Sequence, residues 1–562
     1  MSEIIFLQSP PPKFEDVQRI IFSGEALEFL ARIHKHFDVE IEQLYKNRLM
    51  RAVETRTQSS LDFKKSPERD DKTWNISPLP SRLQNRHLDL GDVSASNTAH
   101  FVSALNEDVQ GIQVDFDDGH CPTWRNQLQA YQNIRLAVLG KLQGAPATIS
   151  MCPVLMLRPR AWNMIEHNIL IDGKEAIGPL VDFAILMFHN AKKLYEANSG
   201  PCFYLSKLEG ASEAKLWNDI FVWTQKELGI PQGTIKACVL IENIVSSFEL
   251  EEILYALREH SLGLNCGIWD YCASIIAKFG DREQYLLPDR NKYVSMERHF
   301  LNSYLQLVVG ACHARAAPAT GGMAAAMLPP GADTTSRESK AIIAKILEAK
   351  LKEIECGVDG FMVYDSRVVP HANELWKKSG ATPNQISKKF QVDITPQDLL
   401  AIPSGGVTLQ GLKHNVAISI LFIYYWLAGI GHFFYSGNVE DSATAEISRF
   451  QIWQWIRFSE SHPQPPRAVS RAAYDRTTAP SGRHSIDADS RRRSQAPRHS
   501  QTSRENGLVV RRARAQEPLP VQRRAQAAHG RPVHESRAVP EQEPAGIYHQ
   551  LFKRQPQVQN LT

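Results

Sequence analysis

The chain has 562 residues, of which 43% are hydrophobic and 22% charged, a composition typical of a soluble globular protein with two or three domains. Its formal net charge of +3 hides an uneven distribution, because residues 459–562 contain 17 Arg, one Lys and nine acidic residues. That segment carries a charge of +9, which leaves −6 for residues 1–458. A mildly acidic body excludes a protein whose main surface binds nucleic acid.

The eight cysteines are too few and too scattered for a fold held together by disulfides. They form no C-x-x-C pair and stand within apolar stretches, so we expect buried, reduced thiols and a reducing compartment. The N-terminal segment has no basic stretch followed by an apolar one, and no secretory signal is predicted.

Residues 1–107 are predicted to form an N-terminal helical cap on the main domain. The stretch GEALEFLARIHKHFDVEIEQLYKNRLMRAV repeats apolar residues at helical spacing. A polar connection that contains prolines, SPERDDKTWNISPLPSRLQN, follows it.

Residues 108–375 alternate short apolar runs with amphipathic helices. Solidly apolar runs are typical of parallel strands that are covered on both faces. About eight such units indicate an α/β protein with a TIM (β/α)₈ barrel rather than an open sheet. Neither G-x-G-x-x-G nor G-x-x-x-x-G-K-[ST] occurs, which excludes the usual nucleotide-binding folds. The predicted strands include GIQVDFDD, ATISMCPVLMLRP, VDFAILMF, PCFYLSKLE, TIKACVLIEN, GLNCGIWDY and DGFMVYDS.

Residues 376–458 again show a helical pattern and are predicted to form a C-terminal helical domain. Within it, residues 416–435 (VAISILFIYYWLAGIGHFFY) are apolar enough to span a membrane. The segment is isolated and runs into a polar motif, so we predict a buried helix and no membrane partner. Residues 459–562 are rich in Arg, Pro, Ser and Gln and are predicted to be a disordered tail.

Polar residues stand where several of the predicted strands end. Glu242 follows four apolar residues, and Asp270 ends the run GLNCGIWD. The C-terminal strand ends of a TIM barrel form its active site, and two carboxylates that converge there suit Mg²⁺. A single carboxylate in such a place is more often a helix N-cap or a surface ion pair, so these residues alone indicate only a metal-assisted enzyme. The other candidates at strand ends are Asp115, Asp117, Asp118, Arg158 and Arg160.

Longer segments of the chain resemble the signature sequences of malate synthases. They are EALEFLARIHKHF, VDFDDGHCPTW, LRPRAWNMIEHNILIDGKE, YLSKLEGASEAKLWNDIF, VLIENIVSSFELEEILYALREHSLGLNCGIWDY, TGGMAAAML and EDSATAEISRFQIWQWIR. They follow the family's order over about residues 20–458 and resemble its shorter, single-barrel form. The resemblance implies condensation of the partners acetyl-CoA and glyoxylate, with Mg²⁺ as cofactor, followed by thioester hydrolysis to malate and CoA.

The resemblance also implies roles for four charged residues. Glu242 and Asp270 match the two metal ligands of the family. Arg158 matches the catalytic arginine, which would stabilise the enolate of acetyl-CoA. Asp441, in EDSATAEIS, matches the catalytic aspartate of the C-terminal domain, which would act as the general base.

Substrate binding is implied for Gly267, Trp269 and Asp270, because this segment is similar to the one whose amides hold the glyoxylate carboxylate. Ile268 stands where the family usually has Arg. Residues 364–366 read Tyr-Asp-Ser where Ala-His-Pro is more usual, so contacts to acetyl-CoA are not predicted there.

The C-terminus departs furthest from the family. Its members continue past the WQWIR helix into further helices, so the C-terminal domain is predicted to be truncated at 458. The 17:1 ratio of Arg to Lys after that point suggests a shifted reading frame. The chain ends in Gln-Asn-Leu-Thr, whereas peroxisomal members end in Ser-Lys-Leu or a near variant. The family implies peroxisome or glyoxysome, with cytoplasm as the alternative.

Two alternative functions stay open. A lyase that cleaves malyl-CoA or citramalyl-CoA would share the metal carboxylates and Arg158 but not Asp441. A catalytically impaired malate synthase, whose basic tail binds anionic partners, is the second alternative, although such a run of charge is usually solvated disorder.

Overall fold

The computed structural model describes residues 5–57, 61–390 and 392–459, and its centre is a closed barrel of eight parallel strands. The order around the barrel is β10-β11-β2-β3-β4-β7-β8-β9. This architecture confirms the predicted TIM barrel. The strands are β2 (Leu88–Val93), β3 (Gly111–Asp115), β4 (Val154–Arg158), β7 (Cys202–Leu205), β8 (Lys236–Ile241), β9 (Ser261–Cys266), β10 (Ala319–Ala324) and β11 (Gly360–Val363).

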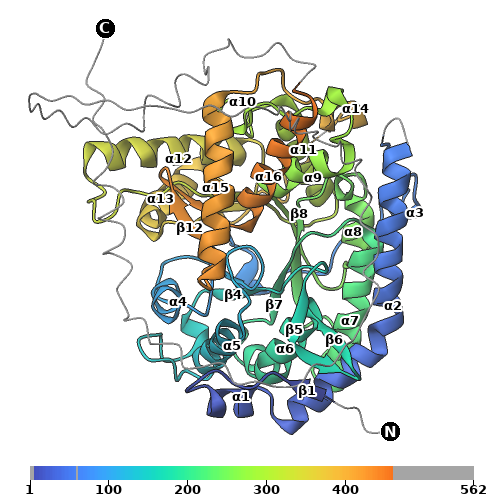
Figure 1. Cartoon of the computed structure of the whole chain (residues 1–562), viewed down its shortest axis with the longest axis vertical. Helices are drawn as coiled ribbons and strands as arrows, with labels where there is room; N and C mark the ends of the chain where they lie inside the picture. The colour runs from blue at the N-terminus through green and yellow to red at the C-terminus, as the bar shows by residue number, and fades with distance from the viewer. Residues whose placement is uncertain (1–4, 58–60, 391, 460–562) are drawn as a thin grey trace, which may run out of the picture. The chain divides into compact units, whose positions relative to one another are not determined.

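Helices connect successive strands and cover the barrel (Figure 1). The longer ones present an apolar stripe to it; α7, for example, buries Trp217, Ile220 and Phe221 at helical spacing. The covering helices are α4 (Thr98–Leu105), α5 (Trp124–Val138), α6 (Gly178–Glu196), α7 (Ala211–Leu228), α8 (Leu250–Ala256), α9 (Ile268–Phe279), α10 (Arg290–Tyr293), α11 (His299–Ala314), α12 (Arg337–Glu355) and α13 (Val369–Ser379).

One strand prediction is corrected by the structure. The run VDFAILMF lies inside helix α6, where residues 181–187 are all buried. An apolar run that is buried all round carries no periodicity that separates a helix from a strand. The strand that VDFAILMF was expected to supply is replaced by β2 (LDLGDV), whose two aspartates conceal its buried character. The barrel therefore begins at Leu88, inside the range 1–107 that was assigned to the N-terminal cap.

The N-terminal region is helical, as predicted, and is built around one long helix. Helix α2 (Gly24–Thr57) packs on α6 and α7 along the edge of the barrel (Figure 1). Its core contacts recur at helical spacing through Phe29, Ile33 and Phe37. The region also contains β1 (Ile5–Leu7), α1 (Glu15–Ile21) and α3 (Pro67–Asp70), and β1 pairs with the hairpin of β5 (Ile165–Ile171) and β6 (Lys174–Ile177).

The C-terminal region contains α14 (Pro396–Leu399), α15 (Leu409–Leu427), the hairpin β12 (Phe433–Tyr435) with β13 (Asn438–Glu440), and α16 (Ser442–Arg457). One face of α15 packs against α16. The disorder and the truncation that were predicted after residue 458 concern segment 460–562, which lies outside the described residues.

The prediction of a buried helix at 416–435 is wrong. Helix α15 ends at Leu427, and its buried residues are Gly411, Asn415 and Ile418. On the opposite face Ile420 is 62% exposed and Leu427 is 82% exposed, because no element of the described chain covers them. No helix in the described part of the chain is both long and apolar enough to cross a membrane.

Candidate active site

Charged side chains from five consecutive barrel strands meet at one mouth of the barrel. Parallel strands end at the same edge, so residues at their C-terminal ends become neighbours. In barrel order, Asp118 follows β3, Arg158 ends β4, Lys207 follows β7, Glu242 follows β8 and Asp270 follows β9. The structure therefore brings together four of the strand-end residues that the sequence singled out and adds Lys207 to them. Arg160, another strand-end candidate, instead pairs with Asp182 and Glu166.

Three carboxylates form a cluster that could hold a metal ion. One oxygen each from Asp118, Glu242 and Asp270 lies within 4.8 Å of the others. Burial raises the pKa of Glu242, and it raises the pKa of Asp270 well above its usual range. Carboxylate oxygens gathered in this way are a hard donor set, and a divalent cation would relieve their mutual repulsion. Of the three, Asp118 was a strand-end candidate but was not predicted as a metal ligand.

Lys207 is a functional candidate that the sequence analysis missed. Its ammonium lies 2.7 Å from Asp117, 2.8 Å from Asp118 and 3.8 Å from Asp270. Its backbone amide donates to Glu242 at 2.8 Å, so the residue contacts the cluster from both ends. Its φ of 54° lies in the left-handed region, a strained conformation for a non-glycine residue, of the kind that clusters at functional sites. The sequence feature that could have identified Lys207 is its position directly after the predicted strand PCFYLS.

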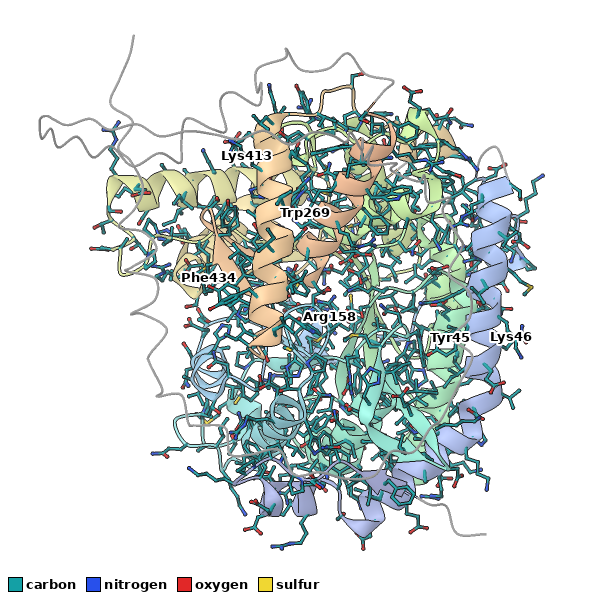
Figure 2. All side chains as sticks on the ribbon, in the orientation of Figure 1. Tyr45, Lys46, Arg158, Trp269, Lys413 and Phe434 are labelled. Atoms are coloured by element: carbon teal, nitrogen blue, oxygen red, sulfur yellow. The ribbon has the colours of Figure 1, made fainter. Side chains whose placement is uncertain are left out.

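Arg158 is buried among acidic groups. Its guanidinium pairs with Asp118, lies 3.1 Å from Asp117 and is 3.6 Å from Asp115. Burial would lower the pKa of Arg158, but these carboxylates outweigh it and hold that pKa well above its usual range. Figure 2 shows Arg158 near the middle of the described part of the molecule. The Nε of Arg158 is buried with no hydrogen-bond partner among the described residues, so one donor is left for an oxygen of a ligand.

Asp441 belongs to the C-terminal region and begins helix α16. Its carboxylate accepts from the amide of Thr444 at 3.0 Å, and the Thr444 hydroxyl accepts from the Asp441 amide at 3.0 Å. It is thus an N-cap in a reciprocal capping box, the ordinary role for an aspartate there. Burial, with added repulsion from Asp118, raises the pKa of Asp441 to about 7.

The next residue, Ser442, connects α16 to the barrel. Its hydroxyl donates to Asp118 at 2.5 Å, and Asp118 also accepts from Lys207 and Arg158. Asp118 is therefore shared by the carboxylate cluster, the arginine and the helix that carries Asp441.

The segment from Gly267 to Asp270 lies at the start of α9, beside the cluster. Gly267 is the N-cap residue, and a Cβ there would lie 3.1 Å from the Cβ of Glu242. Any larger residue would therefore require the Glu242 side chain to shift by a few tenths of an ångström. The guanidinium of Arg290 lies over the Trp269 ring, 4.8 Å from its centroid. Unsatisfied amides at the start of a helix are suited to an anionic group.

The departures at residues 364–366 have structural roles. The Tyr364 hydroxyl lies 2.9 Å from Nε2 of His432, whose Nδ1 lies 2.9 Å from the carbonyl oxygen of Gly119. Asp365 accepts from the amide of Leu328 at 2.9 Å and pairs with Arg367. The substitution thus joins the last barrel strand to the loop after α15.

A parallel (β/α)₈ barrel with clustered carboxylates and a buried arginine at its C-terminal mouth defines a class of metal-dependent barrel enzymes. Comparison with known protein families identifies one family within this class. Residues 154–402 match the family described as "Malate synthase, TIM barrel domain", and residues 406–479 match "Malate synthase, C-terminal". The chain belongs to the malate synthase family.

Known relatives agree with this assignment. Malate synthase of Myxococcus xanthus is 39% identical over 450 residues, which cover 78% of this chain and 82% of that protein. The glyoxysomal malate synthase of Candida tropicalis is 36% identical over 458 residues, with the same coverage of 78% and 82%. A solved Haloferax volcanii malate synthase complex aligns at 13% identity with a TM-score of 0.41, over 70% of this chain and 95% of that one. That likeness is too low to support an inference.

Proposed function

We propose that this chain condenses acetyl-CoA with glyoxylate and hydrolyses the resulting thioester to malate and CoA. The observation that carries the proposal is the 2.5 Å hydrogen bond from Ser442 to Asp118, because it joins the helix of Asp441 to the cluster at the barrel mouth. A base from the C-terminal region and a metal site in the barrel would then act on one substrate pair.

We propose Glu242 and Asp270 as ligands of Mg²⁺, with Asp118 as a third carboxylate within reach. Mg²⁺ takes one or two protein carboxylates and fills its other positions with water and substrate. The three carboxylate oxygens, two buried and one partly buried, fit such an ion. When bound, Mg²⁺ would polarise the aldehyde of glyoxylate. Gly267, Trp269 and Asp270 would then place the glyoxylate carboxylate against the start of α9.

Asp441 would remove a proton from the methyl group of acetyl-CoA. A pKa of about 7 suits this step, because the carboxylate is largely ionised just above neutral pH and still basic enough to accept the proton. Arg158 would stabilise the enolate oxygen through its unpaired Nε–H. The enolate carbon then attacks the aldehyde carbon, and water releases CoA from the thioester.

The alternative of a malyl-CoA or citramalyl-CoA lyase is less well supported, because that activity does not require Asp441. A release assay for CoA separates the possibilities. A malate synthase releases CoA from acetyl-CoA only when glyoxylate and Mg²⁺ are both added. A lyase instead cleaves malyl-CoA without releasing free CoA, and a catalytically impaired chain gives neither reaction.

We propose a peroxisomal or glyoxysomal location, which is supported by relatives that are described as glyoxysomal. Imaging of the full chain, fused at its N-terminus to a fluorescent protein, against a peroxisomal marker tests this. Coincident puncta are expected, whereas diffuse cytoplasmic signal would overturn the proposal.

A further inference from the structure

A cavity lies at the opposite end of the barrel from the carboxylate cluster. It has a volume of about 180 Å³. Val154, Cys202 and Lys236 line it, and these are the first residues of β4, β7 and β8. The candidate catalytic residues follow the C-terminal ends of the same strands, so the length of the barrel separates the two sites.

Two cationic side chains line this cavity, Arg82 and Lys236. Lys236 is only 7% exposed, and its ammonium makes one hydrogen bond, of 2.8 Å, to the carbonyl oxygen of Glu259. Arg82 donates to the Ser199 hydroxyl at 2.5 Å and to the carbonyl oxygen of Cys152. Neither cation forms an ion pair with a carboxylate in the part of the chain that the structure describes.

The carboxylate of Glu259 acts on Lys236 only from a distance. It accepts a hydrogen bond of 2.8 Å from the Ser77 hydroxyl and does not line the cavity. The cavity lining contains no acidic residue. Its neutral polar groups, Asn198 and Thr234, can donate hydrogen bonds.

A buried cation without a counter-charge is unfavourable, and burial lowers the pKa of both Lys236 and Arg82. An ammonium has three donors, and Lys236 uses one of them on a protein acceptor. A ligand with negatively charged oxygens would supply both the missing counter-charge and acceptors for the unused donors of Lys236.

We propose that this cavity binds a small oxyanion, either inorganic phosphate or a short dicarboxylate, through Lys236 and Arg82. Pockets for drug-sized ligands have volumes of about 300–1,000 Å³, so a cavity of about 180 Å³ is too small for a nucleotide or for CoA. The site is distinct from the proposed glyoxylate site, because it lies at the other end of the strands.

Thermal unfolding of the full chain tests the proposal, with phosphate or succinate exchanged for chloride at constant ionic strength and without added Mg²⁺. A ligand that binds the native state raises Tm in a saturable way. We expect saturation with at least one of the two anions, and the stronger response identifies the class of ligand. Lys236→Met and Arg82→Gln should each weaken the apparent affinity at least tenfold.

Two further variants locate the response. Glu242→Gln removes negative charge from the catalytic end of the barrel. If the anion affinity of this variant equals that of the wild type, the anion binds at the other end. Lys350→Met, which removes a buried lysine paired with Glu353, is the matched control and should also leave the affinity unchanged. We expect Lys236→Met to fold, because it removes an uncompensated buried charge.

Several results would overturn the proposal. They are the absence of a saturable shift with both anions, equal responses in the wild type and in the Arg82→Gln and Lys236→Met variants, or a large change in affinity on Glu242→Gln. None of them bears on CoA release, so this site and the proposed function can fail separately.

Discussion

The Ser442 hydroxyl donates a 2.5 Å hydrogen bond to the carboxylate of Asp118, and so connects the C-terminal helix α16 to the barrel mouth. The two residues are far apart in the sequence, and neither was assigned a role by the family resemblance. Asp118 lies in the carboxylate cluster that is proposed to bind the metal, while Ser442 follows the proposed base. The bond therefore couples the position of Asp441 to the site that would hold glyoxylate.

Replacing Ser442 with Ala removes this connection. A hydrogen bond to a charged group contributes about 1.5–3 kcal/mol, so we expect kcat to fall roughly tenfold to a hundredfold. Steady-state kinetics with both substrates measures this. Ser419→Ala is the control, because the Ser419 hydroxyl donates within α15 to the carbonyl oxygen of Asn415. Equal kcat values in the two variants would show that the bond has no part in catalysis.

Asp441→Asn tests the proposed base while it keeps the helix cap. Asparagine is as good an N-cap as aspartate, so α16 should remain folded and the circular dichroism spectrum should not change. Loss of a general base typically lowers the rate by about 10²–10⁴-fold, which we expect in kcat. Near-normal turnover in a folded variant would remove Asp441 from the mechanism.

The pH dependence of the reaction follows from the pKa of Asp441. The base must be ionised, so kcat/KM should fall as the pH drops below about 7. The negative charge of Asp118 contributes to this raised pKa, and Asp118→Asn should move the acid limb to lower pH. A profile that is flat from pH 8 down to about 5 would contradict the assignment.

Asp441 also makes stability depend on pH, but in the opposite direction to activity: a rising pH increases the activity and lowers the free energy of unfolding. Folding raises the pKa of Asp441 from 3.8 to about 7, so the native state binds its proton more tightly than the unfolded state does. Its contribution is fully present below about pH 4 and is lost as the pH rises to about 7. Denaturant unfolding without metal should show this decline in the wild type and less of it in Asp441→Asn.

Lys207 should govern how strongly the protein depends on its metal. Without Mg²⁺, its ammonium is the cation nearest to Asp117, at 2.7 Å, and it shares Asp118 with Arg158. Lys207→Met would remove one of the two cations that pair with these carboxylates in the described part of the chain, so Tm should fall in EDTA and the rise in Tm on adding Mg²⁺ should be larger than in the wild type. The buried pair of Lys350 with Glu353 lies outside the cluster, so Lys350→Met should leave the Mg²⁺-induced shift unchanged. A smaller Mg²⁺ shift in Lys207→Met would contradict this role.

The TIM barrel could be predicted from the sequence because alternation of apolar runs and amphipathic helices is a local pattern. Glu242 and Asp270 could be singled out for the same reason, since each ends an apolar run. The role of Lys207 was missed because it depends on which strand ends are neighbours, and the barrel order of β3, β4, β7 and β8 is a property of the closed sheet.

The errors also have physical causes. The run VDFAILMF is buried on all sides within α6, so its pattern does not identify it as a helix. The apolar segment in α15 was predicted to be buried and not to span a membrane, because it is isolated and runs into a polar motif, but burial requires a covering element. Composition shows which side chains prefer the interior. Only the tertiary structure shows whether another element packs against them.

The most direct test of the proposed function is CoA release by the purified full chain with acetyl-CoA, glyoxylate and Mg²⁺. We predict release that requires glyoxylate, is lost in EDTA and is nearly abolished by Asp441→Asn and by Glu242→Gln. A folded wild-type protein that releases no CoA when glyoxylate is added, or that releases it equally in both variants, would contradict the function proposed for this chain.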